Sequence, residues 1–199
     1  MPSRHIFRRH TERGVTLIEV LVTILIMVFG LLGLAGLQAR IQVAELESYQ
    51  RAQAIVLLQD MVDRLTANRK ESTNYVTNAT GVGTTGVTGA AVCAALPTVW
   101  ERDRCEWGDT LAGASETKAG NQVGAMLGAR GCVFETVTTM PREYVISVVW
   151  QGLTNTAAPA GTTCGQNQYG NEAARRAITA RVVVGCLQND PTSGVCLTP

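Results

Sequence analysis

The strongest constraint on the fold is a long apolar segment near the amino terminus, residues 15–37, which reads VTLIEVLVTILIMVFGLLGLAGL. Its 23 residues contain one charge, Glu19. As an α-helix the segment would span roughly 34 Å, enough to cross a bilayer core of about 30 Å. Residues 1–14 carry four arginines against one glutamate. Because basic residues resist translocation, this charge predicts a cytoplasmic amino terminus and a body on the far side of the membrane.

The rest of the composition excludes several kinds of function. Lys plus Arg is 17 and Asp plus Glu is 16, which gives a formal net charge of +1 and disfavours a nucleic-acid binder. Both histidines, His5 and His10, precede the apolar segment. The body of the chain therefore lacks the histidine that Ser-His, Cys-His and most zinc sites require. The sequence predicts no catalytic residue, no metal site and no cofactor.

Six cysteines, an even number, indicate disulfides formed in an oxidising compartment. None belongs to a Cys-x-x-Cys motif, which disfavours zinc and thioredoxin-like redox sites. The pairing stays open at this stage. Cys93 with Cys105 is favoured because the pair closes a short loop, and Cys186 has Cys164 or Cys196 as candidate partners. The disulfide candidates are Cys93, Cys105, Cys132, Cys164, Cys186 and Cys196.

Three interpretations of the amino-terminal segment compete. A secretory signal usually has an apolar core of about 7–15 residues before its cleavage site, which here would follow Ala35. A plain signal anchor fits the length but gives no reason for Glu19. A carboxylate at mid-membrane costs on the order of 2.5–3.5 kcal/mol, less near the edge, so such a residue suggests a function. The alternative to a functional Glu19 is a carboxylate that lies near the membrane interface and tilts into the headgroups.

Residues 13–22, RGVTLIEVLV, resemble the prepilin cleavage motif of type IV pilins and of the related pseudopilins. The resemblance implies that prepilin peptidase cuts after Gly14 and methylates the new amino terminus at Val15. It also implies that Glu19 is the glutamate used in assembly. Val15 differs from the phenylalanine that is commonest at this position in the family.

The chemistry of Glu19 is consistent with this resemblance. Cleavage creates an α-amino group with an ordinary pKa of roughly 7.7–8.0, positive at neutral pH. A carboxylate in the first turns of a helix is favoured by the helix dipole, and in a low dielectric it attracts the amine strongly. An amine from a neighbouring subunit would align one helix with the next. The alternative is a pair within one chain, one turn apart.

The helix is predicted to continue to about Asn68. Apolar residues recur at steps of three or four, which favours an amphipathic helix, and two (i, i+4) pairs, Glu47–Arg51 and Asp60–Arg64, support it. Residues 53–69 resemble the helix end of PilV-type minor pilins. The predicted buried stripe consists of Ile41, Ala44, Ala52, Ile55, Leu58, Val62 and Leu65.

The carboxyl-terminal part contains three segments with strand character, residues 132–138, 143–151 and 177–187, separated by loops. They predict an antiparallel sheet that covers the distal half of the helix. Residues 73–91 read as an irregular loop, and Trp100 and Trp107 as core residues. The predicted fold class is α+β, with a long amino-terminal helix packed against a small sheet, which resembles the pilin fold.

The predicted domains are a leader (residues 1–14), the transmembrane half of the helix (15–37), its amphipathic half (38–69) and a globular pilin domain (70–199). The resemblance implies a PilV-like minor pilin of a type IV pilus, not an enzyme, which is incorporated into the fibre or primes its assembly. The alternatives are a type II secretion minor pseudopilin and, less favoured, a membrane-anchored periplasmic enzyme or binding domain.

The implied partners are prepilin peptidase, other minor and major pilins, the inner-membrane assembly platform and membrane lipid, with no nucleic acid. The implied location is a single pass through the inner membrane with a periplasmic body, followed by the pilus outside the cell.

Overall fold

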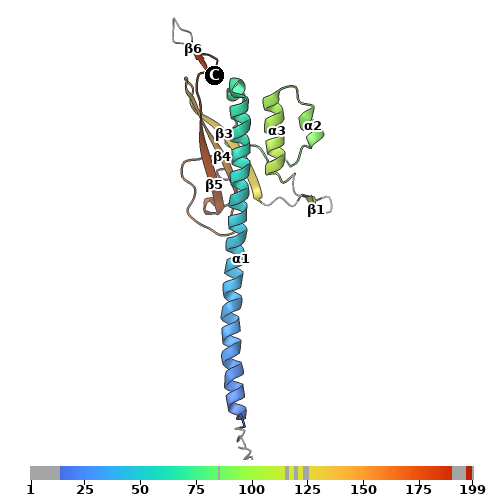
Figure 1. The fold of residues 1–199 in the computed structure, drawn as a ribbon, viewed down its shortest axis with the longest axis vertical. Helices are drawn as coiled ribbons and strands as arrows, with labels where there is room; N and C mark the ends of the chain where they lie inside the picture. The colour runs from blue at the N-terminus through green and yellow to red at the C-terminus, as the bar shows by residue number, and fades with distance from the viewer. Residues whose placement is uncertain are drawn as a thin grey trace, which may run out of the picture. The chain divides into compact units, whose positions relative to one another are not determined.

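The computed structural model describes residues 14–84, 86–114, 117–118, 121–122, 126–189 and 196–198. The chain divides into two compact units between Ala44 and Glu45, and the first helix runs through both. In chain order the elements (Figure 1) are α1 (Leu17–Ala67), η1 (Arg69–Tyr75), α2 (Ala90–Ala94), α3 (Val99–Leu111), β1 (Thr117–Lys118), β2 (Asn121–Gln122), β3 (Leu127–Val137), β4 (Arg142–Gln151), η2 (Glu172–Ala174), β5 (Arg175–Val184), β6 (Gln188–Asn189) and β7 (Cys196–Thr198). Of the predicted leader, only Gly14 belongs to the described residues.

The first unit, as far as it is described, consists of the amino-terminal part of α1 and the three residues before it. The carbonyl oxygen of Thr16 accepts hydrogen bonds from the amides of Glu19 at 3.1 Å and Val20 at 3.3 Å, which starts the helix. No proline interrupts the helix after this point. A β-carbon added at any of its glycines would meet no atom within 4 Å outside the adjacent helix backbone. The predicted start at residue 15 is therefore correct to within two residues.

The core of the second unit lies where α1, α3 and the sheet meet. In Figure 1, α2 and α3 lie to one side of α1, and β5 lies to the other. Trp107 of α3 is fully buried in this core, which confirms it as a core residue, whereas Trp100 is partly buried and packs against the core from outside. The buried residues of the core are Ala54, Leu58, Met61, Leu65, Tyr75, Trp107, Leu111, Met126, Ala129, Val133, Tyr144, Ile146, Val148, Trp150, Val182 and Val184.

The buried face of α1 differs from the predicted stripe. Ile41 and Ile55, both predicted to be buried, are exposed. The buried line runs through Gln50, Ala54, Leu58, Met61 and Leu65. Leu58 and Leu65 of the predicted stripe are therefore confirmed as buried, and Val62 packs against the core. Ahead of Leu58 the prediction is wrong, because the covered positions there are Gln50 and Ala54, and a polar residue and a small one give little apolar signal in the sequence.

The main sheet has the antiparallel order β3-β4-β5, which confirms the predicted strands and the α+β fold. β4 and β5 pair without a register shift from Arg142–Val184 to Gln151–Arg175. Tyr144, Ile146 and Val148 lie on the face toward the core, as the alternation predicted. The connection between β3 and β4 contains a cis Met140–Pro141 peptide bond.

The predicted irregular loop, residues 73–91, is more ordered than the composition indicated. It contains the end of η1, the start of α2 and a bridge between Val82 and Gly131 of β3. Thr77 donates its amide to the carbonyl oxygen of Val133 at 2.9 Å. Gly81 has a φ of +76°, and a β-carbon there would lie 2.6 Å from the carbonyl oxygen of Gly131. Glycine is therefore needed for this close approach to β3.

Two disulfides with both cysteines described lie in the second unit. Cys93–Cys105 joins α2 to α3, which is the pair that the short loop favoured. Cys132–Cys164 joins β3 to the loop before η2, so Cys164 is not the partner of Cys186. Cys186 is disulfide-bonded as well. The side chain of Cys196 lies outside the described residues.

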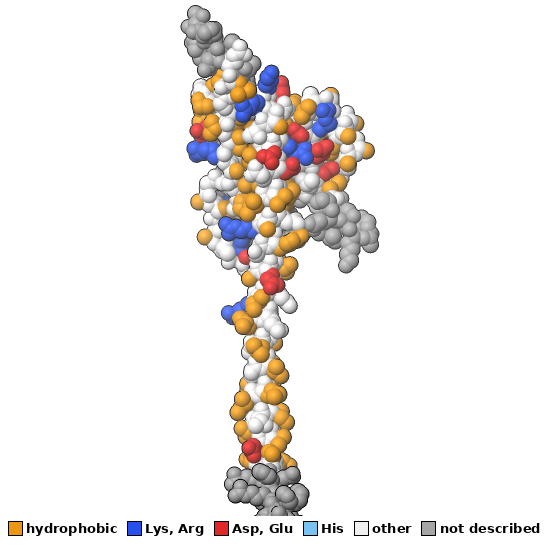
Figure 2. Space-filling model, in the orientation of Figure 1, with side chains coloured by type: hydrophobic (Ala, Val, Ile, Leu, Met, Phe, Trp, Pro, Cys, Tyr) orange, Lys and Arg blue, Asp and Glu red, His pale blue; other side chains and the backbone are white. Residues whose placement is uncertain are grey.

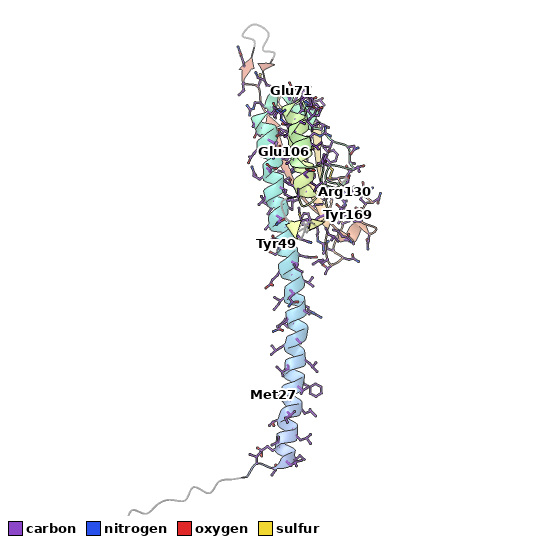
Figure 3. All side chains as sticks on the ribbon, turned by 90° about the vertical axis from the view of Figure 1, so that its right-hand side faces the viewer. Met27, Tyr49, Glu71, Glu106, Arg130 and Tyr169 are labelled. Carbon is purple, nitrogen blue, oxygen red and sulfur yellow. A yellow bond between two sulfur atoms is a disulfide. The ribbon has the colours of Figure 1, made fainter. Side chains whose placement is uncertain are left out.

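The loop between β4 and η2 packs on the sheet face opposite to α1. Its Cys164 forms a second small core with Cys132 and Val149. Tyr169 from the same loop donates its hydroxyl to the carbonyl oxygen of Gly128 at 2.8 Å. In Figure 3, Tyr169 lies beside Arg130, whose guanidinium carbon is 5.8 Å from the ring centroid. Burial raises the pKa of Tyr169 to about 12, so its hydroxyl keeps the proton that it donates.

Candidate assembly site

The predicted cleavage site lies in an accessible segment. Gly14 and Val15 are exposed and precede the first residue of α1, Leu17. The peptide bond between Gly14 and Val15 is not part of the helical hydrogen bonding, which begins at the carbonyl oxygen of Thr16. The geometry is compatible with cleavage between these two residues.

Glu19 is the acidic residue of the first turn of α1, and its side chain is exposed. A carboxylate in this place is stabilised by the unpaired amides of the helix start. After cleavage, the new amine at Val15 would lie four residues ahead, about one turn away. Because the Glu19 side chain is exposed, the amine of a neighbouring chain could also reach it.

The helix surface that follows Glu19 is apolar and exposed. Large apolar side chains from Val20 to Leu37 are between 45% and 67% exposed, and Figure 2 shows hydrophobic side chains covering this part of α1. Met27 projects away from the helix (Figure 3). Within the described residues, α1 is the one helix long and apolar enough to cross a membrane. So large an exposed apolar surface requires lipid or other apolar helices around it.

Further along α1, Arg64 joins the helix to α3. Its Nε lies 2.9 Å from Asp60, which confirms the predicted (i, i+4) pair. Its Nη1 lies 2.9 Å from Asp103 and 2.8 Å from Glu106 of α3. Burial alone would lower the pKa of the Arg64 guanidinium, but its hydrogen bonds to Glu106 and Asp60 raise the pKa above its ordinary value. Arg64 is therefore a permanent cation among three carboxylates.

The same network includes η1. The fully buried Tyr75 donates its hydroxyl to Asp103, and Asn68 donates to the Tyr75 oxygen at 3.2 Å. Burial and the Asp103 carboxylate raise the pKa of Tyr75. The network accounts for three residues of the helix-end motif, Asp60, Arg64 and Asn68. Their role is to hold the end of α1 against α3 and η1.

The second predicted helix pair, Glu47–Arg51, is wrong, because Glu47 pairs with a different arginine. The Glu47 carboxylate lies 3.1 Å from the guanidinium of Arg176, on β5. Sequence analysis missed this contact, because residues 129 positions apart carry no local signal of their pairing. The roles of Gly14, Val15 and Glu19 stay predictions, which rest on a contiguous motif.

The described residues define a class, that of an α+β protein with a long amino-terminal helix whose first half is apolar and exposed. Two family models match the chain. The prokaryotic N-terminal methylation motif matches residues 9–35, and the Tt1218-like model, described as type IV pilin Tt1218, matches residues 36–107. The two matches support a type IV pilin. No similar curated protein and no similar solved structure is found.

The two matches support a broad function. A type IV pilin with a methylation motif has a pilin or pseudopilin role, which is structural. The motif implies processing by prepilin peptidase and assembly with other pilins. The apolar helix fits a single-pass anchor in the inner membrane.

Proposed function

We propose that this chain is a minor pilin of the PilV type, cleaved after Gly14 and then incorporated into a type IV pilus or used to prime its assembly. The observation that carries the proposal is the placement of Glu19, an exposed carboxylate in the first turn of α1 and the single charge of the exposed apolar residues 15–37. The resemblance of residues 53–69 to the helix end of PilV-type pilins supports the minor-pilin assignment.

In this proposal residues 1–14 are the leader, 15–37 the membrane half of the helix, 38–69 its amphipathic half and 70–199 the globular domain. Before extraction the apolar half lies in the inner membrane, with the amino terminus in the cytoplasm and the body in the periplasm. In the fibre, neighbouring helices replace the lipid. The Glu19 carboxylate then pairs with the methylated amine of Val15 on an adjacent subunit, so that each charge compensates the other in a low dielectric.

Processing is tested first. Mass spectrometry of the protein purified from membranes should find a chain that begins at Val15 and carries one N-methyl group. Replacing Gly14 by a bulky residue should accumulate the uncleaved form. An intact start at Met1, or a start after Ala35, would contradict the proposal.

Assembly is tested with Glu19→Ala and Glu19→Gln. Both variants should insert into the membrane, because an intramembrane carboxylate has been removed. Leaving the partner amine uncompensated costs on the order of 3–5 kcal/mol, enough to reduce incorporation more than a hundredfold. The measurement is the ratio of this subunit in sheared pili to that in the membrane fraction, with cleavage checked in each variant. Incorporation of both variants at the wild-type ratio would overturn the role of Glu19.

A type II secretion pseudopilin would be processed in the same way. Recovery of the wild-type protein with sheared pili decides for the type IV pilus. Recovery only with the secretion system would decide for the pseudopilin.

A further inference from the structure

Glu47 of α1 accepts three hydrogen bonds from two distant segments. Its Oε1 lies 3.2 Å from the amide nitrogen of Thr154, 2.9 Å from the Thr154 hydroxyl and 3.1 Å from Nη2 of Arg176. Thr154 belongs to the loop after β4, and Arg176 lies on β5. One carboxylate oxygen thus joins the helix, a loop and the sheet.

Arg176, which donates to the Glu47 carboxylate, is itself oriented by main-chain groups. Arg176 Nη1 donates to the carbonyl oxygen of Ala173 at 3.1 Å, and Nη2 donates to the carbonyl oxygen of Thr154 at 2.6 Å. The guanidinium also fits against Gly152, where a β-carbon would lie 2.6 Å from its central carbon. Arg176 is therefore oriented by main-chain groups and presents its remaining donor capacity to the helix.

Glu47 also lies where α1 begins to contact the rest of the second unit. Among the described residues of α1, it is the first whose side chain forms a hydrogen bond to a segment outside the helix. The buried line of α1 begins three residues later, at Gln50. Glu47 is thus the first attachment of the helix to the rest of the second unit.

We propose that Glu47 is a positioning residue for assembly, which sets the rotation of α1 about its own axis against β5 and the loop that follows β4. The proposal rests on the proposed function, because it concerns how the helix is presented to other subunits. A rotation by one residue would turn the contacting face by about 100°. The apolar contacts of Ala54, Leu58 and Met61 are non-directional and permit small rotations, whereas hydrogen bonds accept one orientation. Arg64 and the bond from Trp107 to Leu57 orient the distal part of α1 against α3, and the three bonds of Glu47 orient the helix against β5 and the loop after β4.

Hydrogen exchange tests the attachment itself. The samples are the full mature chain in one detergent, as wild type, Glu47→Ala, Glu47→Gln and the control Glu45→Gln, which removes an exposed charge two residues away. In Glu47→Ala the Thr154 amide loses its acceptor, so exchange in residues 152–156 should rise about tenfold. Exchange in the helix beyond Leu58 should stay unchanged, which shows that the variant is folded. An unchanged loop in Glu47→Ala would overturn the attachment.

Incorporation tests the positioning role. The ratio of the subunit in sheared pili to that in membranes should fall several-fold in Glu47→Ala, fall less in Glu47→Gln, which keeps an acceptor oxygen, and stay at the wild-type value in Glu45→Gln. Faster loop exchange with normal incorporation would overturn the positioning role alone. Absence of the wild-type protein from pili would overturn the proposed function and this role with it, while the exchange experiment would still decide whether the attachment exists.

Discussion

Gly131 of β3 lies directly against the indole ring of Trp107 of α3. A β-carbon at Gly131 would come within 2.1 Å of the ring carbon Cη2 of Trp107. The same indole donates its Nε1 hydrogen to the carbonyl oxygen of Leu57 in α1 at 2.8 Å. Trp107 therefore connects α1, α3 and the sheet at one point. It can do so because β3 has no side chain where the ring lies.

We expect Gly131→Ala to destabilise the second unit by about 1–3 kcal/mol or more, because the methyl group overpacks a fully buried ring. The control is Gly185→Ala, where an added β-carbon meets no atom within 4 Å. Denaturant unfolding of the mature chain in detergent, followed by tryptophan fluorescence, measures the difference. Equal midpoints for the two variants would contradict the packing described here.

Arg64 is the cation shared by three carboxylates of α1 and α3. In Arg64→Met the carboxylates of Asp60, Asp103 and Glu106 would face one another without their cation. We expect a loss of about 1.5–3 kcal/mol, the range for a hydrogen bond to a charged group. Arg64→Lys should lose less, because it keeps the charge but not the fork of donors. Lys70→Met, at an exposed position, is the control, and a loss as large in this control would refute the specific role of Arg64.

The contribution of Glu47 should depend on pH. Burial alone would raise the pKa of the Glu47 carboxyl, but the hydrogen bonds from Thr154 and the charge of Arg176 lower it below its ordinary value of 4.5. A carboxyl with a lowered folded-state pKa stabilises the fold at pH values above 4.5, and this stabilisation is lost as the pH falls through the lowered pKa.

The stability difference between wild type and Glu47→Gln should therefore be about 1 kcal/mol at pH 7 and shrink below pH 4.5. Unfolding of both proteins from pH 7 to pH 3 measures it. A difference that stays constant, or grows toward low pH, would show that the charge of Glu47 is not what stabilises the contact.

The remaining disulfide can be mapped directly. Cys186 is bonded, and the pairs Cys93–Cys105 and Cys132–Cys164 account for four of the other five cysteines, so we predict Cys196 as its partner. We expect proteolysis of the unreduced protein to yield one linked peptide pair that contains Cys186 and Cys196, and alkylation before reduction to label no thiol. Labelling of Cys196, or its recovery in a bridge between two chains, would contradict this pairing.

The sequence by itself determined the elements that depend on local pattern. The apolar run determined the start of α1, alternation determined β3, β4 and β5, and the contiguous motif around Gly14 and Glu19 pointed to the pilin class. Each of these rests on neighbours in the chain, where the periods of 3.6 and 2 residues are directly readable. The same holds for Asp60–Arg64, a pair one helical turn apart.

Tertiary structure alone decided which residues of α1 are buried ahead of Leu58 and which partner Glu47 takes. Ile55 is exposed and Gln50 is buried because the sheet and α3 determine which face is covered. The pattern of apolar residues along the helix does not show where the sheet and α3 will pack. Glu47 bonds to Arg176 rather than Arg51 because main-chain groups of a distant loop already orient that guanidinium. Likewise, the need for glycine at position 131 follows only from the fold, which packs Trp107 against it.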